Sequence, residues 1–151
     1  MSKNIIIIFL ISIFLYSCGY APMYSTNNRV SFYIESIDFK GDRDLNNYIE
    51  STLTKYNQNQ DAKKLIITAF STYEKATISK NVSGDATEYQ LTATVEFNIK
   101  TDLLEKNVLI KEIFNMKNFT DEFEESTYEK TIKKNFSYSI SNKLIMQLSK
   151  M

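Results

Sequence analysis

The chain has 151 residues, and its 18 basic and 18 acidic side chains leave it without net charge. This length suits a single domain with a hydrophobic core, and the balanced charge lacks the basic excess that is typical of nucleic-acid binding. Histidine is absent, which excludes Ser-His and Cys-His nucleophile pairs and most zinc sites. We therefore predict a protein without a metal or a cofactor.

The N-terminus has the organisation of a secretory signal peptide. Lys3 gives a short basic start, residues 5–16 are almost entirely apolar, and the small residue Ser17 ends the segment. As a helix, the apolar stretch would measure roughly 18 Å, which is short of the ~30 Å hydrocarbon core of a bilayer. We predict a signal peptide over residues 1–17 rather than a membrane span.

Cys18 is the only cysteine of the chain, so it cannot form an internal disulfide in an exported protein. Residues 15–18, LYSC, resemble a bacterial lipobox, and the resemblance implies that Cys18 is the acylated first residue of the mature chain. Acylation would anchor the chain stably in a membrane. Gly19 stands where many lipoproteins retained in the inner membrane have Asp, which predicts the periplasmic side of the outer membrane. The alternative is an ordinary signal peptide with an incidental cysteine.

The first part of the mature chain predicts a tether, a strand and a helix. Residues 18–29 contain Gly, Pro and Asn and predict a lipidated tether. Alternation from residue 30 to residue 34 indicates a strand, with a bulge towards its end. Asp42 or Asp44 can cap the following helix, in which apolar residues recur every three to four positions over residues 45–56.

Three further strands are predicted from composition and alternation. Residues 65–78 are rich in β-branched and aromatic side chains, and residues 79–85 form a turn. Residues 89–99 alternate strictly between apolar and polar, so one face of that strand should be buried and the other wet. Residues 103–109 predict a hairpin turn into a last strand over about 108–119.

A long amphipathic helix ends the chain. Ser126 and Glu129 match a capping box, and acidic side chains precede them. Apolar residues recur every four positions over residues 128–148, which favours a broad face packed on a sheet over a coiled coil. The order β-α-β-β-β-α, without an internal repeat, predicts one α+β domain over residues 30–151.

The segment after the lipobox resembles a known family. Residues 18–25, CGYAPMYS, are similar to the Cys-Gly-aromatic-x-Pro-hydrophobic-Tyr start of the lipopolysaccharide-assembly lipoprotein (LptE) family, especially its alphaproteobacterial members. Residues 45–53, LNNYIESTL, resemble the first helix of that family, and residues 85–99 resemble one of its strands. The matched positions are Leu45, Asn47, Ile49, Leu53, Ala86, Thr87 and Leu91.

The resemblance implies a fold, a partner and a role. Members have two helices packed on one face of a mixed four-stranded sheet, and they plug the outer-membrane barrel LptD. The complex places lipopolysaccharide in the outer leaflet, and the plug is not an enzyme. Because a barrel of this kind has a polar interior, the wet face of the strand over residues 89–99 is the candidate barrel-facing surface, at Gln90, Thr92 and Thr94. The alternative is that this face meets solvent.

Lysines are the candidate contacts for the phosphates of lipopolysaccharide. Lys75, Lys80, Lys133 and Lys134 can act as point charges on phosphate if lipopolysaccharide binds, whereas the alternative is ordinary solvated surface. The acidic run over residues 121–126 lacks the spaced oxygen ligands and the turn glycine of an EF-hand loop. We therefore interpret it as the solvated start of a helix.

Two other functions stay open. One is a small-ligand-binding lipoprotein, which needs an apolar pocket between the sheet and the helices. The other is a structural lipoprotein of another envelope machine, such as one that serves outer-membrane protein insertion. Co-purification distinguishes the three, because it recovers a lipopolysaccharide-transport barrel, a small ligand or a different complex.

Overall fold

The computed structural model describes residues 32–57 and 63–151. The predicted signal peptide, Cys18, the tether and the first residues of the predicted domain lie outside the described residues. The elements in chain order are β1 (Phe32–Gly41), α2 (Arg43–Leu53), the 3-10 turn η1 (Thr54–Tyr56), β2 (Lys63–Lys80), β3 (Ala86–Lys100), β4 (Glu105–Lys117) and α3 (Glu122–Leu148).

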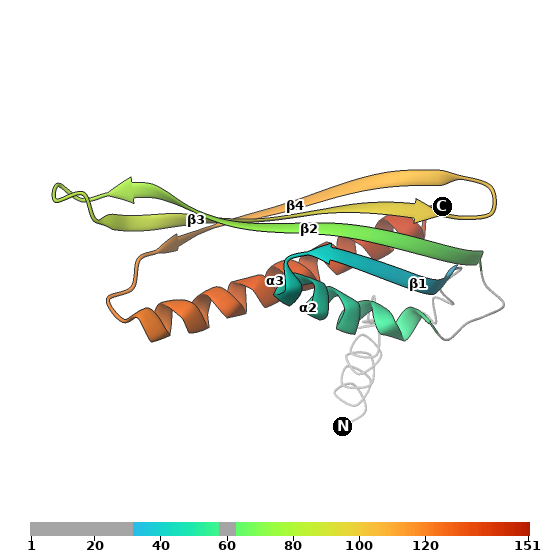
Figure 1. Ribbon diagram of the computed structural model, residues 1–151, viewed down its shortest axis with the longest axis horizontal. Coiled ribbons are helices and arrows are strands. Elements are labelled where there is room, and N and C mark those ends of the chain that lie inside the picture. Colours follow the sequence, from blue (N-terminus) through green and yellow to red (C-terminus); the bar gives the residue numbers. More distant parts are fainter. Residues whose placement is uncertain (1–31, 58–62) are drawn as a thin grey trace, which may run out of the picture.

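The four strands form one mixed sheet in the order β1-β2-β3-β4. β1 pairs parallel with β2, and α2 lies in the crossover between them, whereas β2–β3 and β3–β4 are antiparallel hairpins. Both helices cover the same face of the sheet (Figure 1). The predicted α+β fold, with two helices on one face of a mixed four-stranded sheet, is therefore confirmed.

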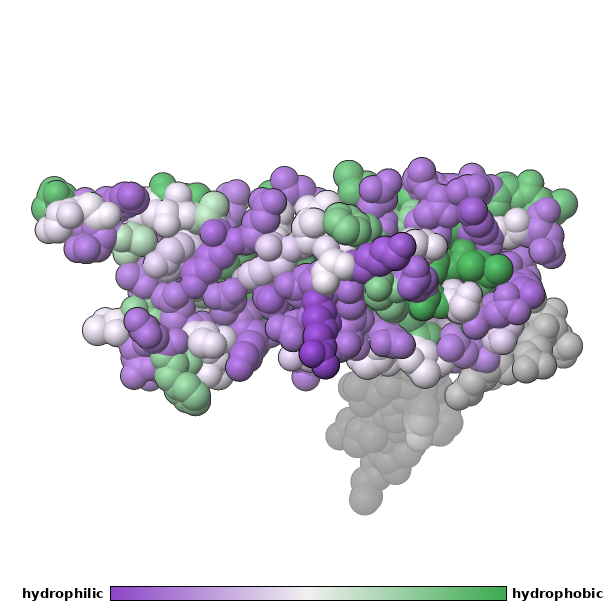
Figure 2. Space-filling view, in the orientation of Figure 1, coloured by the Kyte–Doolittle hydropathy of each residue, from purple (hydrophilic) through white to green (hydrophobic). Residues whose placement is uncertain are grey.

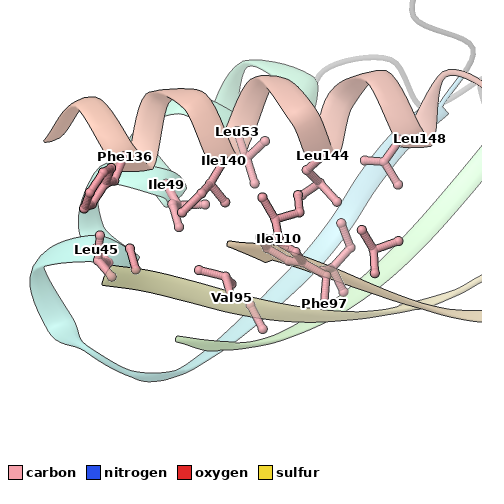
Figure 3. Close-up of a cluster of buried hydrophobic side chains, with 14 of the residues drawn as sticks. Leu45, Ile49, Leu53, Val95, Phe97, Ile110, Phe136, Ile140, Leu144 and Leu148 are labelled. Carbon is pink, nitrogen blue, oxygen red and sulfur yellow. The ribbon is translucent and has the colours of Figure 1, made fainter. Parts of the chain in front are cut away.

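The core lies between this sheet face and the two helices (Figure 3). Strict alternation in β3 turns its apolar side chains towards the helices, and those from Leu91 to Ile99 are fully buried, whereas Tyr89 is partly buried. Four-residue spacing places one side of α3 over them. The buried members of this spacing are Ile132, Phe136, Ile140, Leu144 and Leu148. Tyr128, at the start of the same series, is exposed and lies against Phe119, with ring centroids 5.3 Å apart.

The helix caps confirm one prediction and correct another. Asp42, one of the two predicted caps, caps α2 by accepting a hydrogen bond from the Leu45 amide at 2.9 Å. The predicted capping box at Ser126 is wrong, because α3 begins earlier and Asp121 is its N-cap. Aspartate caps a helix at least as well as serine, and the acidic residues that follow Asp121 then lie in the first turn, where they complement the helix dipole.

The hairpins are longer than alternation predicts. β2 and β3 extend to a short turn over residues 81–85, and β4 begins at Glu105 rather than near residue 108. The added pairs are polar, as in Lys100 opposite Glu105 and Asn98 opposite Asn107. Backbone hydrogen bonds extend the strands over these positions, although their polar side chains do not show the alternation that predicts a strand. Among the helices that the structure describes, none is both long and apolar enough to cross a membrane.

Candidate functional site

The face of the sheet that the helices leave uncovered, which we call the open face, contains the predicted barrel-facing residues. Gln90, Thr92 and Thr94 point outward and are half-buried, because Leu91 and Ala93 between them fill the core. They form a row inside the open face, since β3 is an inner strand that lies between β2 and β4. Their contact with a barrel stays a prediction.

The neighbouring strands add apolar side chains to the open face. On β2, Ile66 is 42% exposed and Phe70 is 53% exposed, and on β4 the values are 68% for Leu109 and 52% for Ile113. Their register places each of them opposite an outward residue of β3, with Ile113 opposite Thr92, Phe70 and Leu109 opposite Glu96, and Ile66 opposite Lys100. Hydrophobic residues accordingly appear among hydrophilic ones along the sheet side of the molecule (Figure 2).

Sequence reasoning missed this apolar component. Alternation identifies a wet face on β3 alone, because β2 and β4 contain apolar residues on both faces, so the sequence predicts an interface made of polar groups. The signal that identifies the outward residues is the register with β3: Phe70 and Leu109 both lie opposite Glu96, which points outward. The open face is therefore mixed in character.

Amide side chains give the open face hydrogen-bonding groups held in place. The Asn98 Nδ2 atom donates to Glu105 at 2.6 Å and to Asn107 at 2.8 Å. The Gln90 Nε2 atom donates to Asn115 at 3.4 Å. These groups retain lone pairs and N–H bonds that a polar partner surface can meet.

The four predicted phosphate-contacting lysines are not brought together. Lys80 ends β2 at the tip of the β2–β3 hairpin, and Lys134 is exposed on α3. Lys75 and Lys133 lie on the helix side of the sheet, each held by carboxylates. Their role in lipopolysaccharide binding stays a prediction for all four.

A clamp of ion pairs joins β2 to the N-terminal half of α3. Lys75 Nζ lies 2.6 Å from Glu125 Oε1 and 3.0 Å from Glu129 Oε2. Lys133 Nζ lies 3.1 Å from the Asp42 carboxylate, which also caps α2. The ion pairs line a polar cleft of about 270 Å³ between these elements.

The clamp perturbs its own titratable groups. The hydrogen bond from Lys75 lowers the pKa of Glu125. Burial acts in the opposite direction, whereas a second hydrogen bond, from the Phe119 amide, lowers this pKa further. Burial lowers the pKa of Lys75, but its hydrogen bonds to Glu125 and Glu129 outweigh this and raise it overall. Burial, and then the Glu129 carboxylate, raise the pKa of Tyr73 far above its usual value.

Each lysine of the clamp lies between two carboxylates, so the clamp is a structural device. The Lys133 ammonium lies 4.1 Å from the centre of the Tyr73 ring, in cation–π contact. Within the described ranges, no group of acidic residues or cysteines is arranged to hold a metal ion. The arrangement ties α2, α3 and β2 together, and the open face remains the candidate site for a partner.

The fold of the described domain is similar to that of several solved bacterial lipoproteins. The rare lipoprotein B from Shewanella oneidensis superposes with a TM-score of 0.57 at 17% identity, over 74% of this chain and 90% of that one. Lipoprotein B from Nitrosomonas europaea gives 0.54 at 15% identity, over 83% and 90%. A minor lipoprotein from Acinetobacter baumannii gives 0.51 at 12% identity, over 78% and 94%.

These identities are low, so the likeness is one of fold. No protein-family model and no curated protein sequence matches the chain.

Proposed function

We propose that this chain is a lipoprotein of the bacterial envelope, anchored on the periplasmic side of the outer membrane through acylated Cys18. Two independent features support the proposal. The lone cysteine ends an apolar leader that resembles a signal peptide with a lipobox. The domain that follows shares its fold with solved bacterial lipoproteins.

We propose further that the domain plugs the lipopolysaccharide-inserting barrel LptD, helps to assemble it and so aids lipopolysaccharide transport to the cell surface. The observation that carries this proposal is the open face, a sheet surface that its own helices leave uncovered. A plug must meet the polar interior of a barrel, and the row at Gln90, Thr92 and Thr94 offers uncharged hydrogen-bonding groups for that contact. The resemblance of residues 18–25 to the LptE family supports the same role.

A ligand-binding role finds less support in the packing. It requires an apolar pocket between the sheet and the helices, yet core side chains such as Phe97, Ile140 and Leu144 fill that space and are fully buried. Interiors packed to this degree leave little room for a ligand. The same observations are compatible with a structural role in another envelope machine. A pull-down that recovers a different complex would reveal this role.

The test of the plug is capture of the barrel from cross-linked outer membranes with the tagged full chain. LptD should be recovered with the unmodified protein, and depletion of the protein should stall lipopolysaccharide short of the cell surface. Recovery of a different complex, with normal surface lipopolysaccharide in depleted cells, would reject the transport role.

A double substitution locates the contact. Thr92→Asp with Thr94→Lys adds charges to the open face directly opposite Glu74 and Lys111, so neither new charge gains a partner. The new side chains do not enter the core, so the fold should persist while barrel capture falls, because unpaired desolvated charges are costly. The matched control is Thr127→Lys with Thr131→Asp, which adds the same charges to the exposed side of α3. Equal capture by both variants would exclude the open face as the contact.

Anchoring has its own test. Cys18→Ser should move the protein from the membrane fraction to the soluble fraction, and mass spectrometry of the unmodified protein should show acyl groups on Cys18. A variant that still sediments with membranes, together with an unmodified protein that carries no lipid, would refute acylation.

A further inference from the structure

One end of the domain collects the features of a membrane-contacting surface, and we call it the anchor end. It contains the first residue of β1, Phe32, which pairs with Lys63 at the start of β2. Across the sheet, Lys100 at the end of β3 pairs with Glu105 at the start of β4. The C-terminus of the chain lies at this end too, since Lys63 Nζ donates to the Met151 carbonyl at 3.2 Å.

The β3–β4 turn at the anchor end presents leucines to solvent. Leu103 is 90% exposed and Leu104 is 42% exposed. The turn is fixed by Thr101, whose hydroxyl accepts hydrogen bonds from the amides of Leu103 at 3.3 Å and Leu104 at 3.0 Å. The Thr101 amide in turn donates to the Leu104 carbonyl at 2.9 Å. Exposure of Leu103 is therefore built into an ordered turn.

Among the described residues, the side-chain carboxylates of the anchor end are those of Glu35, Glu105 and Asp102, which lies in the turn beside Leu103, and six lysines outnumber them. Two of these lysines form ion pairs, Lys64 with Glu35 at 2.7 Å and Lys100 with Glu105 at 3.8 Å, and all four side chains are more than a third exposed. Exposed ion pairs of this kind contribute little free energy, so these lysines can leave their partners for another anion. The remaining lysines of this end, which form no ion pair within the part of the chain that the structure describes, are Lys55, Lys63, Lys106 and Lys150.

The opposite end of the molecule has a different character. It contains the N-terminus of α3, where Asp121 is followed by Glu122, Glu124 and Glu125 in the first turn. The β2–β3 hairpin extends past that point (Figure 1). β2 has 18 residues and so separates the hairpin tip from the anchor end by roughly 60 Å.

The proposed lipid anchor enters the domain at the lysine-rich end. The segment over residues 19–31, which connects Cys18 to Phe32, can span at most about 50 Å. An acyl chain on Cys18 thus holds the anchor end within about 50 Å of the bilayer, which is the end where the tether joins the domain. Hydrophobic residues are visible in Figure 2 at the end where the β3–β4 turn lies.

We propose that the anchor end rests on the bilayer, with Leu103 and Leu104 inserted at the interface and the lysines of this end on anionic phospholipid headgroups. The proposal rests on acylation of Cys18. The acylated Cys18 already attaches the chain to the membrane stably, so the effect of the leucines and lysines is on the orientation of the domain. Each lysine near an anionic surface strengthens binding about fivefold. The contact orients the domain and does more than tether it.

The test measures depth at the two ends of the full acylated chain. Because acylation blocks Cys18, the only native cysteine, a thiol introduced by Leu103→Cys can be labelled alone with an environment-sensitive fluorophore. The matched position is Val82→Cys at the hairpin tip, where Val82 is fully exposed. The protein is reconstituted in vesicles of phosphatidylethanolamine and phosphatidylglycerol that contain lipids with nitroxide-labelled tails.

The label at residue 103 should be quenched and the label at residue 82 should not. Lys106→Glu with Lys150→Glu should remove most of the quenching at residue 103, whereas Lys117→Glu with Arg43→Glu, away from the anchor end, should leave it unchanged. Equal quenching at both labelled positions, or none at either, would overturn the proposal.

Failure of the anchor and failure of the plug give different results. A chain that carries no acyl group by mass spectrometry and does not float with vesicles would refute the anchor and this inference together. Quenching confined to residue 103 in a protein that captures no barrel would uphold the membrane contact and reject the plug.

Discussion

At the scale of single residues, Gly41 controls the passage from β1 into α2. Its φ of +101° is one that side-chain-bearing residues rarely adopt, and a Cβ at this position would collide with the Ser71 carbonyl. The close approach lets the Asp42 amide donate to that same carbonyl at 3.2 Å. Ser71 itself is buried and donates to the Asn46 side chain at 2.7 Å, so the passage is joined to the helix by hydrogen bonds.

Gly41→Ala should therefore destabilise the domain by about 3 kcal/mol or more, from backbone strain and overpacking together. Gly84→Ala is the matched control, because Gly84 also has positive φ, at +94°, but has open space where a Cβ would lie. Its cost should be about 1–2 kcal/mol, from conformation alone. Denaturant unfolding measures both values, and equal costs would show that the contact with Ser71 is unimportant.

The ion-pair clamp makes stability depend on pH. The pKa of Glu125 is lowered in the folded protein, so its contribution is present above the unfolded value of about 4.5 and is lost as pH falls through the folded pKa. Glu125→Gln should be less stable than the unmodified protein at neutral pH, and the difference should vanish in acid. Urea unfolding across this range measures it, and a difference independent of pH would mean that the charge of Glu125 does not matter.

At the scale of elements, α3 shows how the start of a helix is chosen. Both Asp121 and Ser126 can cap, but only Asp121 has its side chain bonded to free amides, at 2.8 Å to Phe123 and 2.9 Å to Glu124. Starting at Asp121 also lets Glu125 reach Lys75 on β2. Tertiary contact therefore favours the earlier start over the capping box.

Asp121→Ala should cost about 0.5–2 kcal/mol of stability, because two amides at the start of α3 lose their acceptor. Ser126→Ala, inside the helix and exposed, should change stability by less than ~0.5 kcal/mol. Thermal or urea unfolding of the two variants compares them directly. A larger loss for Ser126→Ala would restore the capping box as the true helix start.

The comparison of sequence and structure is clearest for β3 and its neighbours. Alternation from Leu91 to Ile99 identifies the buried face, because successive side chains of a strand point to opposite faces of the sheet and the apolar ones therefore share one face. Phe70 and Leu109 are apolar like the core residues beside them, and only pairing with β3 shows that they point outward. Contacts such as Lys75 with Glu129 join segments far apart in the chain, so periodicity cannot predict them.

At the scale of the whole molecule, the two faces of the sheet differ in what they contact. One sheet face is covered by α2 and α3 and holds the core, whereas the open face carries exposed apolar and amide groups together. Apolar side chains gathered on an otherwise polar surface are typical of interaction sites. The anchor end lies at the edge of the open face, so a domain resting there leaves that face available to a partner.

The apolar members of the open face should contribute to barrel capture without contributing to folding. Phe70→Thr with Leu109→Thr replaces two exposed side chains by residues that suit strands, so the free energy of unfolding should change by less than ~0.5 kcal/mol. Capture of the barrel should fall, because burial of apolar area favours association. Phe123→Thr is the control, since Phe123 is 80% exposed on α3, away from the open face. If the double variant captures as much barrel as the unmodified protein, the apolar residues do not contribute, and only the polar row at Gln90, Thr92 and Thr94 remains as the proposed contact.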